Sequence, residues 1–513
     1  MRSLHVAVIV PALTAITFAG TALVGAGTAQ SPPVPAPDTG ARWPQFRGPN
    51  GAGIATGNTL PPVEFSASRN MLWRTVLPAG HSSPAVWGDR IFLTAFDKDR
   101  KVLEVIALNQ STGSILWRRG VPAEQIETVH QLSSPATATP AVDGDSVFAY
   151  FGSYGLVAYD FAGEQRWTLP LPTVQVPFGS GTSPVVAGDR VILNRHEPKD
   201  PFLVAIDRKS GTIIWKQTHE VPSGQPIAFG SHSTPLVVGD QIVIHGPTRV
   251  QAFDLATGAP RWWVAASTSG TSTPVSDGNT VYVATWSPFG ESDQVAPLPD
   301  YATMVKRHDA NGDGLLAREE IPADLAIFSR PETPNVPGAA MFVRGSFNRF
   351  DANKDGALAQ GEWEAGLATV TKLTVEHGLL AVRTGGSGDV TTTHVRWKEK
   401  TSIPEVPSPL AYRGRVYMIR NGGILTSLDA ASGKIVYRAR VGAPGPYYAS
   451  PAVAGDRMFV ASGDGIVSVV GIADAMNVLA RNDLGEPVFA SPAICDGVLY
   501  IRTASALMAF GGK

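Results

Sequence analysis

Cysteine is almost absent from this chain, since Cys495 is the only one among 513 residues. A single cysteine excludes an intrachain disulfide and a Cys-x-x-Cys-His haem attachment, and its position near the C-terminal end excludes lipidation of an N-terminal cysteine. The flanking segment SPAICDGVLYI reads as an inner strand. We therefore expect Cys495 to be a small packing residue rather than a nucleophile.

Charge is also scarce. Only 17% of the residues are charged and the formal net charge is −2, which predicts no strong attraction to nucleic acid or to a membrane surface. Glycine (53) and proline (41) are instead abundant, as in β-rich proteins with many tight turns. The length allows several domains or one large repeat architecture, and the composition favours the second.

Long apolar runs are missing except at the N-terminus. Arg2 precedes an apolar run that ends in small residues, which predicts a signal peptide over residues 1–29, cleaved after Ala29. The alternative is an uncleaved anchor, because the run approaches the length that spans a bilayer. Residues 30–42 are Pro-rich and predict a tether. We expect the protein in the periplasm or outside the cell, with no transmembrane span after signal cleavage.

One motif recurs eight times along the rest of the chain. It consists of Ser or Thr, then Pro, a few apolar residues, a Gly-Asp or Asp-Gly turn and an alternating apolar strand, as in TSPVVAGDRVIL (182–193). The prolines of the eight copies are Pro84, Pro140, Pro184, Pro235, Pro274, Pro409, Pro451 and Pro492. A second motif, a Gly turn followed by an aromatic residue, comes after most copies, and its aromatics are Trp117, Trp167, Trp215, Trp262 and Tyr437. Large aromatic faces of this kind are expected to pack on a neighbouring unit.

Each unit of about 40 residues reads as a four-stranded antiparallel meander, and repeats of this period form propeller blades or solenoids. The last copy has only three strands, whereas NMLWRTVL (70–77) is a spare strand ahead of the first complete unit. Together they complete one blade, and closing the ring removes exposed sheet edges. We therefore predict a mainly β fold, an eight-bladed β-propeller closed by an N-terminal strand.

These repeats resemble the eight-bladed propellers with quinoprotein-type repeats, a family that includes quinone-dependent alcohol dehydrogenases and the assembly lipoprotein BamB. The resemblance covers roughly residues 43–513 and includes WPQFRGPNGAG (43–53), a segment typical of secreted bacterial members. It is specific for the fold and weak for activity. The dehydrogenases carry an adjacent-cysteine pair beside pyrroloquinoline quinone (PQQ), and a single cysteine argues against PQQ here. The resemblance leaves two alternatives, a PQQ-dependent oxidoreductase and a BamB-like assembly factor for outer-membrane proteins.

The repeat is interrupted once. Successive motif prolines are 39 to 56 residues apart, except for Pro274 and Pro409, which are 135 apart. Segments 280–286 and 377–384 read as the second and third strands of blade five, so the insertion lies between them. The predicted boundaries are propeller at 43–286, insertion at 287–372 and propeller again at 373–513.

The insertion holds two copies of a twelve-residue calcium loop, DANGDGLLAREE (309–320) and DANKDGALAQGE (351–362). Oxygen donors recur at positions 1, 3, 5, 7 and 12 with glycine at position 6, as an EF-hand requires. The expected ligands of two Ca²⁺ ions are Asp309, Asn311, Asp313, the carbonyl of Leu315 and Glu320 in one loop, and Asp351, Asn353, Asp355, the carbonyl of Ala357 and Glu362 in the other. Alanine at position 9 of both loops leaves that ligand to water.

Helices are expected on both sides of each loop, from the spacing of apolar residues in YATMVKRH, EEIPADLAIF, AAMFVRGSFNRF and GEWEAGLATVTK. The sequence therefore predicts a small α-helical EF-hand pair in blade five. Degenerate hands that bind no metal are the alternative, but every side-chain ligand expected at positions 1, 3, 5 and 12 is present. Between Glu291 and Lys372 there are 13 acidic and 8 basic residues, a net charge of −5 that two Ca²⁺ ions would largely cancel.

Three histidines are expected near the insertion. Connections of a meander alternate between faces, so the link between strands two and three shares a face with the links that precede each inner strand. Those links carry His81, His130 and His232, at the rim of the central funnel. They could bind a metal or ligand there. The alternative is that they satisfy turn backbone, since no His-x-x-x-His spacing supports a metal.

Motifs of common enzymes are missing from the sequence, including Gly-x-Ser-x-Gly, His-Glu-x-x-His and a phosphate loop. TGGSGD (384–389) lies between strands and reads as a hairpin turn. We assign no catalytic residue and expect a secreted or periplasmic calcium-binding propeller that acts as a binding or scaffold protein. It is expected to be a monomer that takes an unknown protein or small molecule at its funnel and no nucleic acid.

Overall fold

The computed structural model describes residues 42–197, 199–220, 230–266, 269–287, 290, 291, 295, 297–329 and 340–512. The predicted signal peptide (1–29) and all but the last residue of the predicted tether (30–42) lie outside the described residues. Among those that are described, no helix is both long enough and apolar enough to cross a bilayer.

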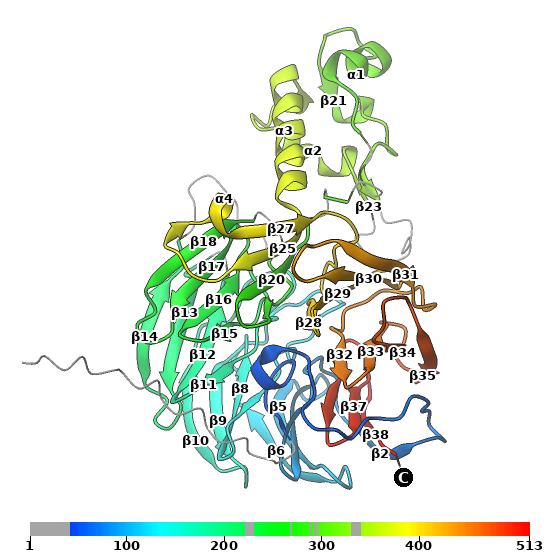
Figure 1. Ribbon diagram of the computed structural model, residues 1–513. Coiled ribbons are helices and arrows are strands. Elements are labelled where there is room, and N and C mark those ends of the chain that lie inside the picture. The colour runs from blue at the N-terminus through cyan, green and yellow to red at the C-terminus, as the bar shows by residue number, and fades with distance from the viewer. Residues whose placement is uncertain are drawn as a thin grey trace, which may run out of the picture. The chain divides into compact units, whose positions relative to one another are not determined.

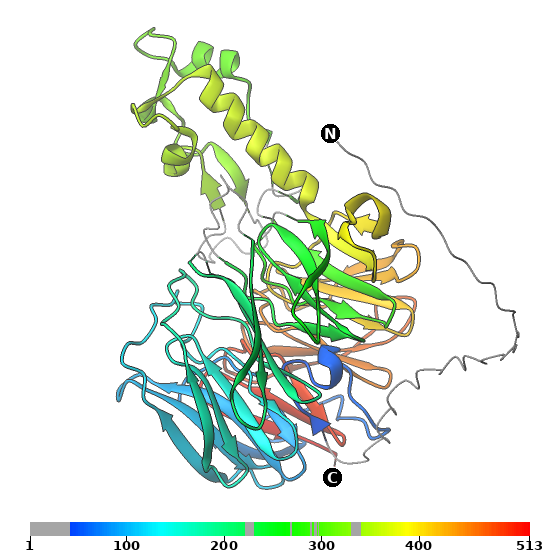
Figure 2. The same cartoon turned by 90° about the vertical axis from the view of Figure 1, so that its left-hand side faces the viewer.

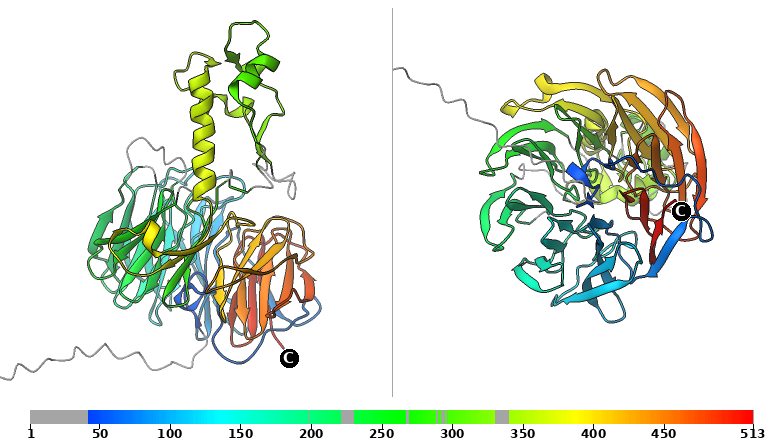
Figure 3. Two further views of the ribbon diagram at one scale, coloured as in Figure 1. Left: turned by 45° about the horizontal axis from the view of Figure 1, so that its top comes forward. Right: turned by 60° about the horizontal axis from the view of Figure 1, so that its bottom comes forward.

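Eight sheets of four or five strands are arranged as the blades of a propeller, which confirms the predicted mainly β fold (Figures 1 and 3). Blade one contains β1 (Arg42–Trp43), β3 (Ala85–Trp87), β4 (Arg90–Asp97), β5 (Val102–Asn109) and β6 (Ile115–Val121). Blade two contains β7 (Ala141–Val142), β8 (Ser146–Phe151), β9 (Gly155–Asp160) and β10 (Gln165–Pro170). Blade three contains β11 (Val185–Ala187), β12 (Arg190–Arg195), β13 (Phe202–Asp207) and β14 (Ile213–Thr218). Blade four contains β15 (Leu236–Val238), β16 (Gln241–His245), β17 (Arg249–Asp254), β18 (Pro260–Ala265) and β26 (Gly388–Asp389).

The remaining blades follow the same order. Blade five contains β19 (Val275–Ser276), β20 (Thr280–Thr285), β25 (Gly378–Arg383) and β27 (Val395–Glu399). Blade six contains β28 (Leu410–Tyr412), β29 (Arg415–Arg420), β30 (Ile424–Asp429) and β31 (Ile435–Arg440). Blade seven contains β32 (Ala452–Ala454), β33 (Arg457–Ala461), β34 (Ile466–Gly471) and β35 (Val478–Asp483). In blade eight, β36 (Ala493–Cys495), β37 (Val498–Arg502) and β38 (Ala506–Phe510) are joined by β2 (Met71–Val76), which pairs antiparallel with β38.

A chain of hydrogen bonds explains why Ser or Thr precedes every motif proline. At seven successive blade junctions, the backbone N–H of this residue donates to the side-chain hydroxyl of its equivalent in the next blade, at 2.9–3.1 Å. The donors and acceptors run in the order Ser83, Thr139, Ser183, Thr234, Thr273, Ser408, Ser450 and Ser491. The following proline favours an extended backbone at the residue before it. All of these residues are buried, so each bond satisfies a donor that water cannot reach.

The eighth junction, between blades eight and one, carries a buried arginine. Arg502 of β37 donates to the hydroxyl of Ser82 (2.6 Å) and to the carbonyls of Thr94 (2.6 Å) and Pro78 (3.2 Å). Burial lowers the pKa of this guanidinium to about 9. Blade eight is thereby tied by one side chain to three backbone segments of blade one and of the link that leads into it.

The motif tryptophans join adjacent blades at their outer edges. The indole N–H of Trp117 donates to the carbonyl of Phe161 in the next blade (2.9 Å), and Trp167 and Trp215 make the equivalent bond. Trp73 of β2 and Trp397 of β27, which also stand on outer strands, do the same. A glycine of the neighbouring turn, such as Gly163, packs against each ring so closely that a Cβ there would clash. Trp262 is the exception, because its N–H bonds to Gln241 in its own blade. The next blade is blade five, whose TGGSGD segment lacks the usual turn.

That segment differs from the expected hairpin turn. Gly388 and Asp389 form β26, which pairs in parallel with Trp262 and Trp263 of β18 and so adds a fifth strand to blade four. A short helix, α4 (Thr391–His394), follows before β27. The blade-five turn does not dock on Trp262, which is fully buried in an apolar cluster that includes Val390, the residue after β26.

The N-terminal segment 43–55 connects four blades. Its β1 pairs with β3, the Pro44 carbonyl accepts from Val142 N–H in blade two (2.8 Å), and Ala55 bonds to Val453 in blade seven. The buried Arg47 side chain donates to the carbonyls of Ser408 and Pro409 at the start of blade six (3.2 and 2.8 Å). A 3-10 turn, η1 (Pro49–Gly51), lies within this segment.

The insertion leaves blade five between β20 and β25, which are still paired along their whole length (Figure 2). It contains α1 (Tyr301–His308), β21 (Leu316–Ala317), η2 (Arg318–Glu320), β22 (Ala326–Ser329), β23 (Ala340–Phe342), η3 (Arg344–Ser346), α2 (Phe347–Phe350), β24 (Ala357–Leu358) and α3 (Gln360–Glu376). It has its own apolar core, which includes Met304, Leu316, Phe350, Leu358 and Trp363.

Two of the four predicted flanking helices are wrong or reduced. The segment EEIPADLAIF after the first loop forms only the η2 turn and then β22, because Pro322 disfavours a helical backbone at Ile321, whose ψ is 127°. AAMFVRGSFNRF before the second loop is helical only in its last turns, η3 and α2, and begins as β23. The other two segments form α1 and α3 as expected.

We predict that Thr234→Val weakens the propeller. The variant keeps the side-chain shape but removes the acceptor of the buried Ser183 N–H (3.1 Å), which should lower the free energy of unfolding by about 1–3 kcal/mol. Urea unfolding of the purified protein measures this. Thr168→Val, on the outer strand β10, is the matched control and should change stability by less than about 0.5 kcal/mol. Equal losses in the two variants would contradict a special role for the inner hydroxyls.

Candidate functional site

The first calcium-type loop is organised by its own carboxylates. The two oxygens of Asp309 accept hydrogen bonds from the backbone N–H groups of Gly312 (2.8 Å) and Gly314 (2.9 Å). Asn311 and Asp313 accept from Asp313 N–H and Leu315 N–H, and Glu320 reaches back to Ala310 and Ala317 N–H (2.9 and 2.8 Å). Gly314 has a φ of 79°, which glycine adopts at no cost. The side chains at positions 1, 3, 5 and 12 therefore hold the backbone of the loop in its turn, and Asp309, Asp313 and Glu320 do not gather as one metal-binding group.

The second loop repeats most of these bonds at the equivalent positions, but not the bond from position 4 to the first aspartate. Asp351 accepts from Gly356 N–H (3.1 Å), and Asn353 and Asp355 accept from Asp355 and Ala357 N–H (2.9 and 3.0 Å). Glu362 reaches back to Ala352, Asn353 and Ala359 N–H. Unlike Asp309, Asp351 is only 6% exposed, and its Oδ1 has no hydrogen-bond partner among the described residues.

The two loops are joined directly. β21 and β24 pair antiparallel with Leu316 opposite Leu358, and both leucines are fully buried. The Tyr301 hydroxyl of α1 lies within hydrogen-bond distance of the carbonyls of Gly314 (2.8 Å) and Leu358 (2.9 Å), one in each loop. The indole N–H of Trp363 donates to the Pro299 carbonyl, so the helix after the second loop is tied to the segment before α1. Each loop thus depends on the other for its position.

The donors fit a hard cation better than a transition metal. Across the described ranges, no three or more His, Cys, Asp or Glu side chains gather as one metal-binding group, and this includes the three carboxylates of each loop. Each loop offers carboxylates, the amide of Asn311 or Asn353 and backbone carbonyls, and all of these candidate donors are oxygen atoms, which Ca²⁺ prefers. The unpartnered Oδ1 of Asp351 is a buried charged atom, and a bound cation would compensate it.

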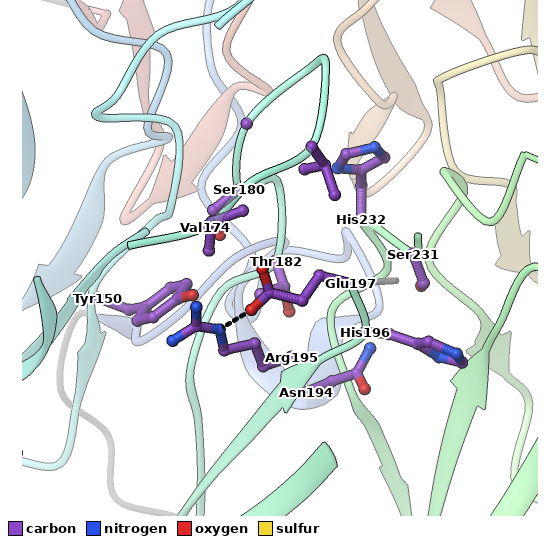
Figure 4. Close-up of a pocket in the computed structure, with 12 residues that line it drawn as sticks. Tyr150, Val174, Ser180, Thr182, Asn194, Arg195, His196, Glu197, Ser231 and His232 are labelled. Atoms are coloured by element: carbon purple, nitrogen blue, oxygen red, sulfur yellow. Dashed lines mark hydrogen bonds and ion pairs between the residues drawn. The ribbon is translucent and has the colours of Figure 1, made fainter. Parts of the chain in front are cut away.

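A second candidate site is a small cavity at the links between blades two, three and four (Figure 4). Its polar lining includes Tyr150, Asn194, Arg195, His196 and His232. Arg195 donates to Glu197 and to the Pro172 carbonyl, which leaves Nη1 without a partner among the described residues. The cavity has a volume of about 20 Å³, which is room for about one water molecule.

Glu127 lies beside this cavity and is the most perturbed acid near it. Its carboxylate accepts from Ser180 N–H (2.9 Å), while Oε1 has no partner in the described part of the chain. Burial raises the pKa of Glu127 to about 7, against the lowering effects of the Ser180 bond and of Arg195. Burial likewise raises the pKa of Tyr150 to about 12 and lowers that of His196 to about 4. The site therefore holds a carboxyl group that titrates near neutral pH.

The three predicted rim histidines are not all brought together. His130 and His232 flank the exposed ring of Phe178, with ring centroids 5.0 and 6.4 Å from it, and His232 also lines the cavity. His81 instead stacks on Phe489 at 4.4 Å, and burial and Arg502 lower its pKa to about 4. His130 Nδ1 accepts from Leu132 N–H (3.2 Å), which is the turn-satisfying role given above as the alternative.

A buried ionic cluster at the base of the insertion was not predicted. His377, which follows α3, accepts Ser287 N–H at Nδ1 (2.9 Å), so its proton is on Nε2, which donates to Glu291 (3.2 Å). Glu291 also accepts from the backbone of Ser402 and Ile403 and pairs with Arg420 of blade six (3.4 Å). The sequence gives no signal for the buried titratable residues of the two clusters, because each is isolated in a link and belongs to no local motif. These residues are Glu127, Glu197, Glu291 and His377.

The sequence matches the family described as "Outer membrane protein assembly factor BamB" over residues 63–197 and 343–510, more than half of the chain. BamB of Yersinia pestis is 27% identical over 223 residues, which are 41% of this chain and 51% of that protein. Tetrathionate hydrolase of Acidithiobacillus ferrooxidans is 27% identical over 173 residues, which are 31% of this chain and 30% of that protein. The chain thus spans about half or less of the length of these curated relatives.

Among solved structures, a europium-containing methanol dehydrogenase is similar with a TM-score of 0.51 and 12% sequence identity. The match covers 91% of this chain and 90% of that chain. At so low an identity the likeness concerns the propeller fold alone, and it carries no information on activity.

We predict that Glu127→Gln makes the protein less sensitive to alkaline pH. Because the native pKa of Glu127 lies above the ordinary value of 4.5, its stabilising contribution is complete below pH 4.5 and is lost as pH rises through about 7. The variant should therefore gain stability relative to wild type between pH 5 and pH 8, by up to about 3 kcal/mol. Urea unfolding at both pH values measures this. The control is Glu124→Gln, which changes an exposed residue of the same link. If wild type and Glu127→Gln show the same pH dependence of stability, Glu127 is not the group that titrates near pH 7.

Proposed function

Because this chain belongs to the family of outer membrane protein assembly factor BamB, we propose that it is a binding or scaffold propeller that carries two calcium-loaded EF-hands. In each hand, side-chain oxygens at positions 1, 3, 5 and 12 and the carbonyl at position 7 would hold the ion. The observation that carries this proposal is the pairing of two loops with the same carboxylate-to-backbone bonds, one of which contains a buried, uncompensated carboxylate oxygen.

Calcium would have a structural role in this arrangement. Two ions would offset most of the net charge of −5 between Glu291 and Lys372. EF-hands of extracellular modules bind with dissociation constants on the order of 10⁻⁴–10⁻³ M, so such sites stay filled where calcium is plentiful. The apolar N-terminal run and the family membership both support a periplasmic or extracellular location, where this condition holds.

A BamB-like role in outer-membrane protein assembly is the second candidate. The family match and the similarity to BamB of Yersinia pestis favour it. It would place the partner among outer-membrane assembly proteins rather than among small molecules. Co-purification with outer membranes from the native cells would support this role. The co-purification should be lost when the insertion or the link that carries Phe178 is deleted. Recovery of the protein only in the soluble periplasmic or secreted fraction would count against it.

A PQQ-dependent oxidoreductase has less support. The likeness to the methanol dehydrogenase concerns the fold, and Cys495 is a single buried cysteine whose pKa burial raises to about 12. A dye-reduction assay after reconstitution with PQQ and Ca²⁺ would detect such an activity directly. PQQ-dependent turnover of an alcohol would overturn the scaffold proposal.

We predict that the double variant Glu320→Gln/Glu362→Gln binds no Ca²⁺ at concentrations that saturate wild type. Each substitution removes the bidentate carboxylate at position 12 while preserving size. Calorimetric titration of protein stripped with chelator should give two ions per chain for wild type. The control is Glu319→Gln/Glu364→Gln, which removes the same charge from exposed neighbours and should keep both sites. A wild-type protein that binds no Ca²⁺ would end the proposal.

A further inference from the structure

The two calcium-type loops differ in how water reaches their first ligand. Asp309 is partly exposed, and both of its oxygens accept hydrogen bonds from Gly312 and Gly314. Asp351 is 6% exposed, and only its Oδ2 is bonded, to Gly356 N–H. Without a cation, the backbone and the exposure of Asp309 stabilise the first carboxylate, whereas Oδ1 of the second is buried and has no donor among the described residues. A buried unpaired charge is costly, so the second loop gains more free energy when a cation binds.

The segments that follow the loops also differ. Glu362 lies in the first turn of α3, a 17-residue helix, and is followed by the fully buried Trp363, whose ring is 5.9 Å from that of Phe350. Glu320 ends the three-residue turn η2, and the extended Ile321 and Pro322 follow it. The position-12 carboxylate of the second loop is therefore held by a packed helix, and that of the first by a short turn. A ligand that is held in place loses less conformational entropy on binding.

The residue at position 4 of the second loop acts against tighter cation binding. Position 4 is Gly312 in the first loop and Lys354 in the second, and Lys354 has a φ of 62° that is uncommon for a residue with a Cβ. Its positive charge also opposes a cation. Lys354 is exposed, however, so solvent screens its charge, whereas the uncompensated oxygen of Asp351 is buried. The buried atom dominates the difference between the loops.

We propose that the two sites are inequivalent, and that the second loop (351–362) takes up Ca²⁺ first and more tightly while the first loop (309–320) fills later. This inference rests on the proposed calcium-binding function. Leaving a buried polar atom unsatisfied corresponds to about a 10- to 100-fold difference in affinity. The order of filling matters because β21 of the first loop pairs with β24 of the second. Calcium in the second loop would therefore fix the strand on which the first loop is built.

Single variants of the full chain isolate each site. Glu320→Gln leaves the second loop to bind, and Glu362→Gln leaves the first. By calorimetric titration at pH 7.5, we expect Glu320→Gln to retain one ion with a dissociation constant at least tenfold lower than that of Glu362→Gln. Asp351→Asn in the Glu320→Gln background should weaken binding by more than Asp309→Asn does in the Glu362→Gln background.

The outcomes separate this inference from the function on which it rests. Equal dissociation constants, or tighter binding in Glu362→Gln, would overturn the inequivalence and leave calcium binding intact. Absence of binding in wild type would instead overturn the proposed function. If Glu362→Gln fails to fold by circular dichroism, the wild-type isotherm decides. An isotherm with two resolved binding steps, of which the weaker is lost in Glu320→Gln, supports the inference. An isotherm with a single step and two equal sites refutes it.

Discussion

The chain of hydrogen bonds through the inner Ser and Thr residues is the constraint on which this propeller depends. Each bond joins the backbone of one blade to a side chain of the next, and seven of them link all eight blades in sequence order. Because the donors are buried, a blade that moved away from its neighbour would leave an N–H without a partner. The indole N–H bonds at the outer edge repeat the same arrangement with larger side chains. Blades one to four and blades five and six are therefore fixed to their neighbours at two radii.

Blade five keeps its strand pairing and its inner bonds on both sides despite the large insertion. The extra residues enter and leave at the ends of β20 and β25, whose pairing is complete, and the inner bond from Thr273 to Ser408 is retained (3.0 Å). The outer attachment to blade four is the one that differs, since Trp262 bonds to Gln241 in its own blade and its strand pairs with β26, whereas the outer bond from Trp397 to blade six is kept. The cluster of Glu291, His377 and Arg420 adds a buried connection between the base of the insertion and blade six.

Much of the fold could be predicted from sequence because its signals are local and repeated. The Ser/Thr-Pro motif located every inner strand, and the twelve-residue repeat located two loops that pair through β21 and β24. The role of the motif hydroxyls was not predicted, because an inter-blade bond needs the ring geometry. Pro322 is a signal against a helix directly after the first loop. The helix predicted there from the spacing of apolar residues was therefore wrong. Glu127 and Arg195 come from different links that meet only in the folded chain, so no sequence pattern could have paired them.

The N-terminal segment has a consequence for how the ring of blades holds its shape. It joins blade two at Val142 to blade six at Ser408 and Pro409, and in a wheel of eight these two blades stand opposite each other. A connection between opposite blades resists their separation, because moving them apart would break the bond at the Pro44 carbonyl or leave the buried Arg47 guanidinium without its acceptors in blade six.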